Sequence, residues 1–488
     1  MSSFLIISII VIYFGALIGI SILTSKNADS DAFFVGNRAS PWYLVAFGMI
    51  GTSLSGVTFI SVPGNVGKFG MAYYQIVLGY IVGYAVIALL LMPMYYKLNL
   101  ISIYTYLEKR FGYWSYKTGA FFFLVSRTLG SSLRLYLAAN VLQIFLFDAW
   151  HVPFGVTVAI TILLIWVYTF KGGIKTIIWT DSFQTVFLIS SVAICVVLIC
   201  GRLDLSFSSL ISTIMDSEYS KTFHFDDFNS KLFFPKQFLG GAFLAIAMTG
   251  LDQDLMQKNL TCKNIGEAQK NMFWFTIILV FVNLLFLTLG ALLYLYSTAK
   301  GIPLPASSDD LFPSLALHEF GTFAGIFFLL GIIASSYASA DSAMTALTTS
   351  FCIDFLNFQD KDEAQKQKQK FRVHIGVSLV FLIIIIIFRE INNRSLIDTV
   401  LTVASYTYGP LLGMYAFGLF TKYSIKDKLV PYICVLSPLI TFILNTYSVV
   451  WFNGYQFSYE LLILNGIITF ILLYFIRNNV TEINHTHA

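Results

Sequence analysis

Long apolar runs separated by short polar loops dominate the chain. A helix needs about 20 mostly apolar residues to cross the hydrocarbon core of a bilayer, and thirteen runs approach or exceed that length. They lie at about residues 3–23, 42–62, 71–96, 118–147, 153–170, 176–200, 237–251, 271–297, 322–356, 371–388, 395–420, 429–448 and 458–476. The pattern predicts an all-α polytopic membrane protein with about 13 transmembrane helices, in which residues 1–488 form a single integral membrane domain.

Composition excludes most other classes of protein. Hydrophobic residues make up 57% of the chain and charged residues only 11%, less than half of the roughly 25% typical of soluble domains. The formal net charge of +4 is too small to indicate a nucleic-acid partner. The five cysteines show neither zinc-site spacing nor a redox pair. Because the sequence also lacks a His/Glu metal cluster, a nucleophile elbow and a phosphate loop, we expect no enzyme activity.

The distribution of Lys and Arg between the loops predicts the orientation of the chain. Cytoplasmic loops carry an excess of both residues. With the N-terminus outside, 20 of the 30 Lys and Arg lie in inner loops, Lys258 among them, and eight lie in outer loops. The other two lie inside the span 118–147. We therefore expect an external N-terminus and a cytoplasmic C-terminus.

The second span, 42–62, carries polar residues that a lipid-facing helix would not. Its glycines are expected to loosen the backbone, and its hydroxyls interrupt the apolar run. These residues are Gly48, Gly51, Gly56, Thr52, Ser53, Ser55 and Thr58. One interpretation is a small-residue packing face between helices. The other is a broken helix, whose freed carbonyls can bind a cation and whose half-helix ends can hold a substrate.

The ninth span, 322–356, combines hydroxyls with a carboxylate. Ser335, Ser339 and Ser342 recur at i, i+4 and i+7, so they share one helix face. Asp341 lies beside them, and a lone carboxylate at membrane depth costs at least about 2.5 kcal/mol. Hydroxyl, carbonyl and carboxylate oxygens are the ligands that a small hard cation such as sodium prefers.

Three more charged residues lie inside predicted spans. Asp181, in the sixth span, is either an interfacial residue that stays in water or part of a buried site. Arg127 and Arg134 are seven residues apart on one face of the fourth span. Each could bind an anionic substrate or pair with an internal acid, and the sequence leaves both interpretations open.

An inverted repeat would account for the spacing of the interruptible spans. The seventh span contains a Gly-Gly pair at 240–241 and Met-Thr-Gly at 248–250, so it could break like the second span, five spans earlier. This spacing predicts a five-plus-five core with repeats at about 42–200 and 237–420. The helices expected outside this core are 3–23, 429–448 and 458–476.

A series of short motifs follows the predicted topology from about Phe33 to Phe420. They are Phe33-Phe34-Val35-Gly36-Asn37-Arg38, Pro41-Trp42, Tyr104-Thr105-Tyr106-Leu107-Glu108-Lys109-Arg110-Phe111, Gly172-Gly173-Ile174, Trp179-Thr180-Asp181, the Ser/Ala-rich ninth span and Tyr408-Gly409-Pro410-Leu411-Leu412-Gly413. In this order the motifs resemble the sodium/solute symporter family, which includes bacterial sodium–galactose, sodium–proline and sodium–sialic acid carriers.

The resemblance implies two cation sites. The family's main sodium site would use carbonyls and hydroxyls of the second and ninth spans, namely Gly51, Leu54, Ser335, Ala338 and Ser339. A second sodium site, present in some sialic-acid-type relatives, maps to Asp181, Asp341 and Ser342. Ala338 stands where many relatives have serine, and Asp341 stands where serine is usual. We therefore expect cation binding to have shifted toward Asp181 and Asp341.

The resemblance also implies where a solute would bind. The hydroxyls of the second span resemble those of the sialic-acid carriers, and an arginine of the fourth span could take a carboxylate. Gln75 is the nearest match to a substrate-binding glutamine on the third span. The candidate solute-binding residues are Ser53, Ser55, Thr58, Gln75, Arg127 and Arg134.

The expected function is sodium-coupled, inward symport of a small polar organic solute by alternating access. A sugar, a sugar acid such as sialic acid, or a carboxylate would fit. We expect a multi-pass protein of the plasma membrane (the bacterial inner membrane), with solute, Na⁺ and the lipid bilayer as partners and no nucleic acid or obligate protein partner. Two alternatives are proton coupling through Asp341 or Asp181, and a sensor that binds solute without moving it.

Overall fold

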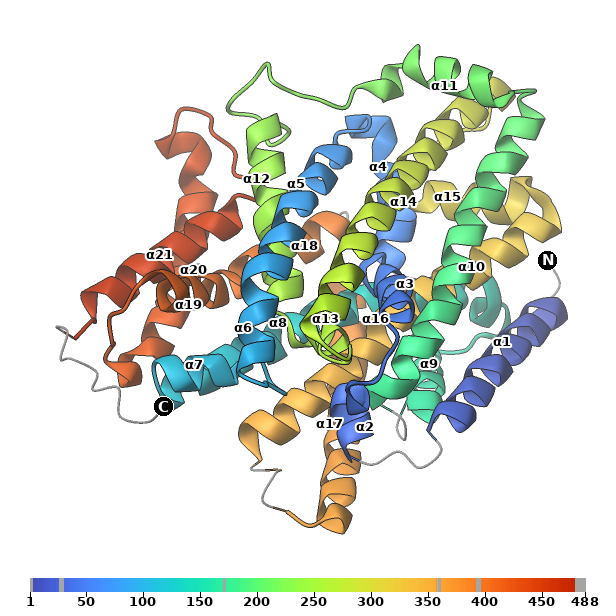
Figure 1. Cartoon of the computed structure of the whole chain (residues 1–488). Helices are drawn as coiled ribbons and strands as arrows, with labels where there is room; N and C mark the ends of the chain where they lie inside the picture. Colours follow the sequence, from blue (N-terminus) through green and yellow to red (C-terminus); the bar gives the residue numbers. More distant parts are fainter. Residues whose placement is uncertain are drawn as a thin grey trace.

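The computed structural model describes residues 3–25, 30–169, 173–356, 358, 361–391 and 396–478. Across these residues the chain forms helices joined by loops, with two isolated backbone bridges (Figure 1). The larger helices are α1 (Ser3–Thr24), α3 (Trp42–Ser53), α4 (Gly56–Phe69), α5 (Tyr73–Val86), α8 (Tyr113–Leu142), α9 (Phe154–Thr169), α10 (Gly173–Arg202), α12 (Phe234–Ala245), α14 (Ile265–Lys300), α16 (Gly321–Phe355), α17 (Glu363–Ile391), α18 (Leu396–Thr407), α19 (Gly409–Phe420), α20 (Val430–Trp451) and α21 (Leu461–Phe475). The shorter ones are α2 (Ser30–Val35), α6 (Met92–Lys97), α7 (Thr105–Arg110), α11 (Phe207–Met215), α13 (Gln253–Asn259) and α15 (Leu311–Ser314).

Seven helical stretches in the described residues are long and apolar enough to cross a membrane, and one bent pair makes eight. The seven are α1, α5 continued into α6, α10, α14, α16, α17 and α20. Helices also occupy the other predicted spans, but each is either too short or too polar to pass the same test. The expected all-α membrane fold is therefore confirmed, while the total of about 13 crossings stays a prediction.

The second predicted span is a broken helix. α3 ends at Ser53 and α4 begins at Gly56, and the two are bent by 59°. Leu54 has φ −89° and ψ 73°, outside the helical region, and Ser55 is extended. The break therefore places the C-terminal end of α3 and the N-terminal end of α4 close together in the centre of the bundle.

The glycines around this break allow close packing, and the expectation that they also loosen the backbone stays a prediction. A Cβ at Gly51 would lie 2.4 Å from Thr185 Oγ1 of α10. A Cβ at Gly56 would lie 2.1 Å from Ser336 Oγ of α16. Because such separations are far inside van der Waals contact, only glycine lets the broken helix approach both neighbours so closely.

The seventh predicted span is interrupted as well, at a different place from its Gly-Gly pair. α12 continues as a π-helical turn over Ile246–Gly250, the helix stops at 251–252, and α13 follows. Gly241 instead packs against α5, where a Cβ would lie 2.2 Å from the carbonyl oxygen of Ile76. The inverted repeat that these two interruptions suggested stays a prediction.

Helix α16 is the centre of the bundle. In its most apolar 18-residue stretch 83% of residues are buried, against 17% in α17. Its neighbours include α3, α8 and α10, and α13 packs beside it (Figure 1). Every residue from 328 to 350 is buried, so the many polar residues of this stretch lie inside the protein and are available for internal chemistry.

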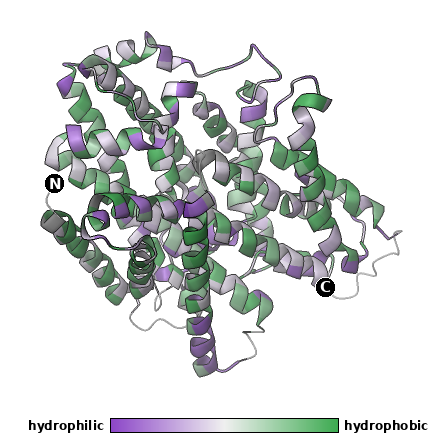
Figure 2. Ribbon diagram, turned by 180° about the vertical axis from the view of Figure 1, so that it is seen from behind, coloured by the Kyte–Doolittle hydropathy of each residue, from purple (hydrophilic) through white to green (hydrophobic). Residues whose placement is uncertain are grey.

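Loops that the sequence assigns to opposite sides of the membrane lie at opposite ends of the molecule. α11 lies at one end, within the predicted outer loop 202–236, and α7 and the start of α17 lie at the other (Figure 1). Hydrophobic residues dominate most helices, and hydrophilic residues gather at helix ends and loops (Figure 2). This arrangement is that of a membrane-spanning bundle, and which end faces the cytoplasm stays a prediction.

Candidate cation and solute site

The end of α3 brings free backbone acceptors into the middle of the protein. The last carbonyls of a helix have no intrahelical donors, and they carry the negative end of the helix dipole. Here those carbonyls belong to residues 50–53, and within the described part of the chain only Ile50 receives an N–H, from Leu54. The N–H of Gly51 donates to Thr185 Oγ1 at 3.1 Å, which fixes α3 against α10. The break therefore presents oxygen ligands suited to a cation, next to α16.

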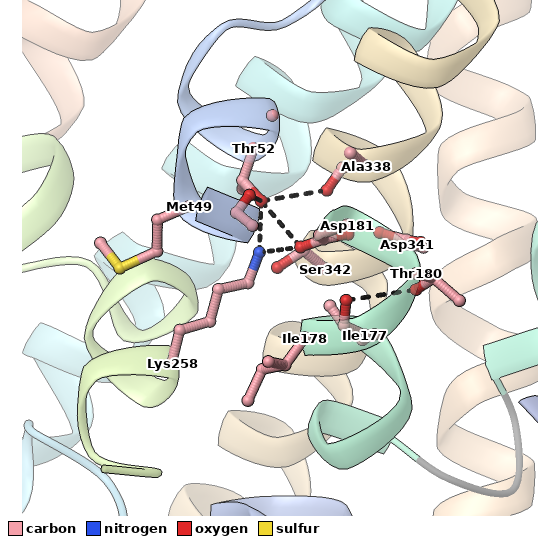
Figure 3. Close-up of polar contacts among 12 residues, drawn as sticks. Met49, Thr52, Ile177, Ile178, Thr180, Asp181, Lys258, Ala338, Asp341 and Ser342 are labelled. Atoms are coloured by element: carbon pink, nitrogen blue, oxygen red, sulfur yellow. Dashed lines mark hydrogen bonds and ion pairs between the residues drawn. The ribbon is translucent and has the colours of Figure 1, made fainter. Parts of the chain in front are cut away.

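Thr52 connects the broken helix to both of its neighbours. Its Oγ1 lies 2.9 Å from Asp181 Oδ2 of α10 and 3.4 Å from the carbonyl oxygen of Ala338 in α16 (Figure 3). Asp181 is fully buried, and its other oxygen, Oδ1, has no partner among the described residues. The wet interfacial interpretation of Asp181 is therefore wrong, and this carboxylate is part of a buried centre.

A lysine that the sequence placed in an inner loop reaches the same centre. Lys258, from α13, is only 1% exposed. Its ammonium forms an ion pair with Asp181 Oδ2 and donates a hydrogen bond to Thr52 Oγ1 (Figure 3). Assigning Lys258 to a solvated loop is thus corrected. The signal that could have found it is its position seven residues after the end of an interruptible span, in a segment without Gly or Pro.

Asp341 is buried on α16, about one helical turn after Ala338. Its Oδ2 accepts a hydrogen bond from the Tyr168 hydroxyl at 2.8 Å, and its Oδ1 has no partner in the part of the chain that the structure describes. The neighbouring Ser342 turns elsewhere, since its hydroxyl donates to Asp254. Of the three residues expected at the second cation site, Asp181 and Asp341 therefore each keep an oxygen without a partner among the described residues, whereas the Ser342 hydroxyl is directed toward Asp254.

The residues expected at the first cation site lie along α3 and α16 as predicted by the helix periodicity. Gly51 and Leu54 are at the break, and Ala338 faces Thr52. The hydroxyl of Ser335 donates to its own helix, at the carbonyl of Ile332, with a distance of 3.0 Å. This leaves the Ser335 oxygen lone pairs free to coordinate.

The two arginines of α8 have different partners. Arg127 forms an ion pair with Asp254 and lies 3.9 Å from Asp252 Oδ2. Asp252 also accepts a hydrogen bond from Tyr408. Arg134 is buried but, within the described residues, meets no carboxylate. Its Nη1 donates to Ser339 Oγ at 3.3 Å, and its Nε has no partner.

A central cavity lies on the α8 side of the break. Besides apolar residues, it is lined by Thr52, Ser53, Ser55, Thr58, Tyr73, Tyr80, Tyr84, Thr249, Asn283, Arg127 and Arg134. The hydroxyl of Ser53 has no partner among the described residues. Five of the six candidate solute-binding residues therefore share one cavity. A larger cavity beside it also uses Tyr73 and includes Lys68 and Lys231.

Gln75 is the exception. It is buried, lies outside the residues that line the central cavity, and holds the loop before α12. Its Nε2 donates to the carbonyl of Leu232 at 3.0 Å, and its Oε1 accepts the N–H of His224 at 3.2 Å. The structure thus gives this glutamine a scaffold contact where a solute contact was expected.

A broken helix that offers ion ligands beside a polar cavity, inside an apolar helical bundle, defines a membrane transporter. The chain belongs to the sodium:solute symporter family, whose family description matches residues 33–425. It is a sodium-coupled solute symporter, a transporter and not an enzyme, and Na⁺ and a solute are its partners. The plasma membrane is the compartment that this family implies.

Individual relatives match over most of the chain. The sodium/sialic acid symporter NanT of Aliivibrio fischeri is 26% identical over 351 residues, which are 70% of this chain and 68% of that protein. The sodium/sialic acid symporter SiaT of Proteus mirabilis is 23% identical over 70% of this chain and 69% of its own length. Sodium-coupled monocarboxylate transporter 2 of Danio rerio is 24% identical over 81% of this chain and 63% of its own length. The chain thus spans less than two thirds of the zebrafish protein.

Solved structures agree on the fold. A Na⁺-coupled sialic acid symporter in a substrate-bound outward-open state superimposes with a TM-score of 0.82, at 19% identity, over 97% of this chain and 98% of that one. Mhp1, a nucleobase-cation-symport-1 family transporter in a closed conformation, gives a TM-score of 0.53 at 14% identity over 92% and 94% of the two chains. At these identities the likeness establishes the shared architecture alone.

Proposed function

We propose that this symporter carries a small organic solute with a carboxylate group into the cell, by alternating access. The observation that carries the proposal is Arg134. Its guanidinium borders the central cavity, is buried, and has no carboxylate partner among the described residues. A buried cation without a counter-ion is costly, and an anionic solute would supply the missing charge through paired hydrogen bonds.

The other polar groups of the cavity favour an oxygen-rich solute. Hydroxyls of Ser53, Ser55 and Thr58 lie at the break, and Tyr73 and Asn283 lie across the cavity. Hydroxyl and amide groups both donate and accept hydrogen bonds. A monocarboxylate or a sugar acid such as sialic acid would use Arg134 for its carboxylate and these groups for its hydroxyls.

Sodium would couple to the solute through the broken helix. A Na⁺ ion between the end of α3 and the face of α16 would hold Leu54 and Ser55 in the conformation that presents Ser53 to the cavity. The proposed ligands are carbonyls of Gly51, Leu54 and Ala338 with the hydroxyls of Ser335 and Ser339. Asp181, Asp341 and Ser342 mark the position of the proposed second cation site, where the Lys258 ammonium already pairs with Asp181. Because each ligand then stabilises the same state, each raises the affinity for the other.

Solute would enter from the end of the molecule that carries residues 202–236. The larger cavity lies beside the central one, and its lining includes Lys231 from that loop. We therefore propose that this end faces outward, with the N-terminus outside, the C-terminus in the cytoplasm and about 13 helices in the bilayer of a bacterial inner membrane. Two five-helix repeats, at about 42–200 and 237–420, would form the moving core.

Proton coupling is the second candidate. Asp181 and Asp341 are buried and each keeps one oxygen without a partner in the described chain. A carboxylate in that position could carry a proton as well as bind a metal ion. The two candidates differ in what drives uptake: a sodium gradient at constant pH, or a pH gradient without sodium.

Ligand-dependent thermal stability of the purified protein tests the proposal. The panel pairs each carboxylate (lactate, pyruvate, sialic acid) with its methyl ester or amide, in sodium chloride and in choline chloride at equal ionic strength. We expect at least one acid to raise the unfolding temperature only in sodium, with no effect of its neutral partner. Stabilisation by neutral sugars alone would contradict the role of Arg134. Uptake in liposomes with a pH gradient and no sodium would establish the proton alternative.

A further inference from the structure

We propose that the Lys258 ammonium permanently replaces a sodium ion at Asp181. This symporter would then bind one Na⁺, although two cation sites are expected from its sequence. The inference rests on the sodium coupling argued above and deepens it. It concerns how many ions drive each transport cycle.

The ammonium lies where a bound cation would be coordinated. It contacts Thr52 of α3 and Asp181 of α10, and the Thr52 hydroxyl lies within hydrogen-bond distance of the Ala338 carbonyl in α16 (Figure 3). These are oxygen groups of the kind that sodium prefers. An ammonium carries the same single charge, and here it donates to two of these acceptors, Thr52 Oγ1 and Asp181 Oδ2.

The charge balance of the centre leaves room for one more cation only. Asp181 and Asp341 are both fully buried, and Lys258 is the cation that the structure places against Asp181. Two carboxylates and one ammonium leave a single negative charge, which one Na⁺ neutralises. The Oδ1 atoms of both aspartates have no partner among the described residues and remain available to it.

Lys258 is held so that it cannot act as a mobile ion. Its backbone belongs to α13, which is buried along its whole length, from Gln253 to Asn259. The Thr261 hydroxyl donates to the carbonyl of Lys258 at 2.6 Å, and Tyr96 donates to that of Asn259 at 2.8 Å. A tethered ammonium can link α13 to α3 and α10 as an ion would, but it is not released into the cytoplasm. It therefore contributes to structure and takes no energy from the sodium gradient.

The test is a sodium titration of Lys258→Met, read as unfolding temperature without solute. In the wild type we expect one saturable sodium effect with a Hill coefficient of about 1. In Lys258→Met, Asp181 is left without its cation, so the protein should be destabilised in choline and restored by sodium. The Hill coefficient should then rise toward about 2, because a second ion binds in the vacated position.

Three further variants make the result decisive. Lys263→Met, an exposed lysine five residues on, should behave as the wild type. Lys258→Arg should retain the single-ion response. The double variant Asp181→Asn/Lys258→Met removes both charges together and should also return to a Hill coefficient of about 1.

The inference is overturned if Lys258→Met shows the wild-type sodium response, or if the wild type already shows the steeper one. It is equally overturned if Lys258→Met stays unfolded at every sodium concentration while the double variant folds, since sodium then cannot take the place of the ammonium. Because the readout needs no solute, its outcome is independent of which substrate is carried. Failure of every carboxylate in the ligand panel would remove the proposed function and leave this inference standing.

Discussion

The buried centre contains two regions, which differ in whether their buried cations have a carboxylate partner. In one region each cation has a carboxylate: Lys258 pairs with Asp181, and Arg127 pairs with Asp254. In the other region Arg134, which borders the same cavity as Arg127, donates to the Ser339 hydroxyl and meets no carboxylate within the described residues. Paired buried charges connect helices and are costly to separate. A buried charge without a partner is instead prepared for a ligand.

The two arginines show what sets this difference. Arg127 and Arg134 lie on one helix face, seven residues apart, and nothing in their local sequence distinguishes them. The distinction comes from Asp252 and Asp254, which follow the interruption after α12 and meet Arg127 from a distant part of the chain. Which of the two arginines is paired therefore depends on the aspartates that follow the interruption after α12.

Among substitutions in the paired region, Asp181→Asn should lower the stability most. This substitution leaves the Lys258 ammonium buried without a counter-charge, and removing one partner of a buried ion pair costs about 3–5 kcal/mol. We expect a large fall in unfolding temperature that sodium does not reverse. Thermal unfolding of the purified variant measures it.

A matched control is available on the surface. Lys221 and Asp226 form an exposed ion pair with a 3.4 Å separation, and such pairs contribute at most about 1 kcal/mol. Asp226→Asn should leave the unfolding temperature nearly unchanged. Equal effects of Asp181→Asn and Asp226→Asn would mean that Lys258 does not depend on Asp181.

The unpaired region should respond differently, through the ligand. Arg134→Gln removes the cavity's free guanidinium without separating an ion pair, so the fold should remain stable. Loss of a charged hydrogen bond worth about 1.5–3 kcal/mol lowers carboxylate affinity by about 10- to 100-fold. Binding of the stabilising acid, measured by calorimetry, gives the value. Arg127→Gln is the comparison, and it should lose stability instead, because Asp254 is then left unpaired. A retained affinity in Arg134→Gln would sink the assignment of the carboxylate site.

Asp341 shares a feature with each region. One of its oxygens is hydrogen-bonded, and the other has no partner in the described chain. Asp341→Asn keeps the shape but removes the charge that the remaining Na⁺ neutralises. We expect sodium-dependent uptake to fall sharply, with the half-maximal sodium concentration raised by about tenfold, equivalent to about 1.4 kcal/mol. Tyr168→Phe separates charge from hydrogen bonding, since it removes the donor and leaves the carboxylate. Unchanged sodium dependence in Asp341→Asn would show that this carboxylate is not an ion ligand.

Much of this centre follows from local sequence. A break in the span 42–62, a polar face on α16 and charges at Arg127, Arg134, Asp181 and Asp341 are all visible as polar residues in apolar runs, where lipid makes them expensive. The side chains arriving from α13 are not visible in that way. Lys258, Asp252 and Asp254 lie in a polar stretch that reads as a loop, and only the tertiary fold buries it.

Glycine illustrates the same limit. The sequence shows that the spans contain small residues, but whether a glycine bends a helix or lets two helices touch depends on a neighbour far along the chain. At Gly51 that neighbour is Thr185. Helix periodicity predicts which face a residue occupies, and it carries no information about what packs there.

The smallest expected effect belongs to Gln75, which sharpens the comparison by lying outside both regions. Gln75→Ala removes one hydrogen bond to Leu232 and one from His224. Water can replace part of this contact at the partly exposed loop, so we expect a loss of about 1 kcal/mol in stability. The solute affinity should stay unchanged, because the side chain does not line the central cavity. A tenfold weaker affinity at unaltered unfolding temperature would show that Gln75 reaches the solute after all, and the site would then include this glutamine beside Tyr73 at the start of α5.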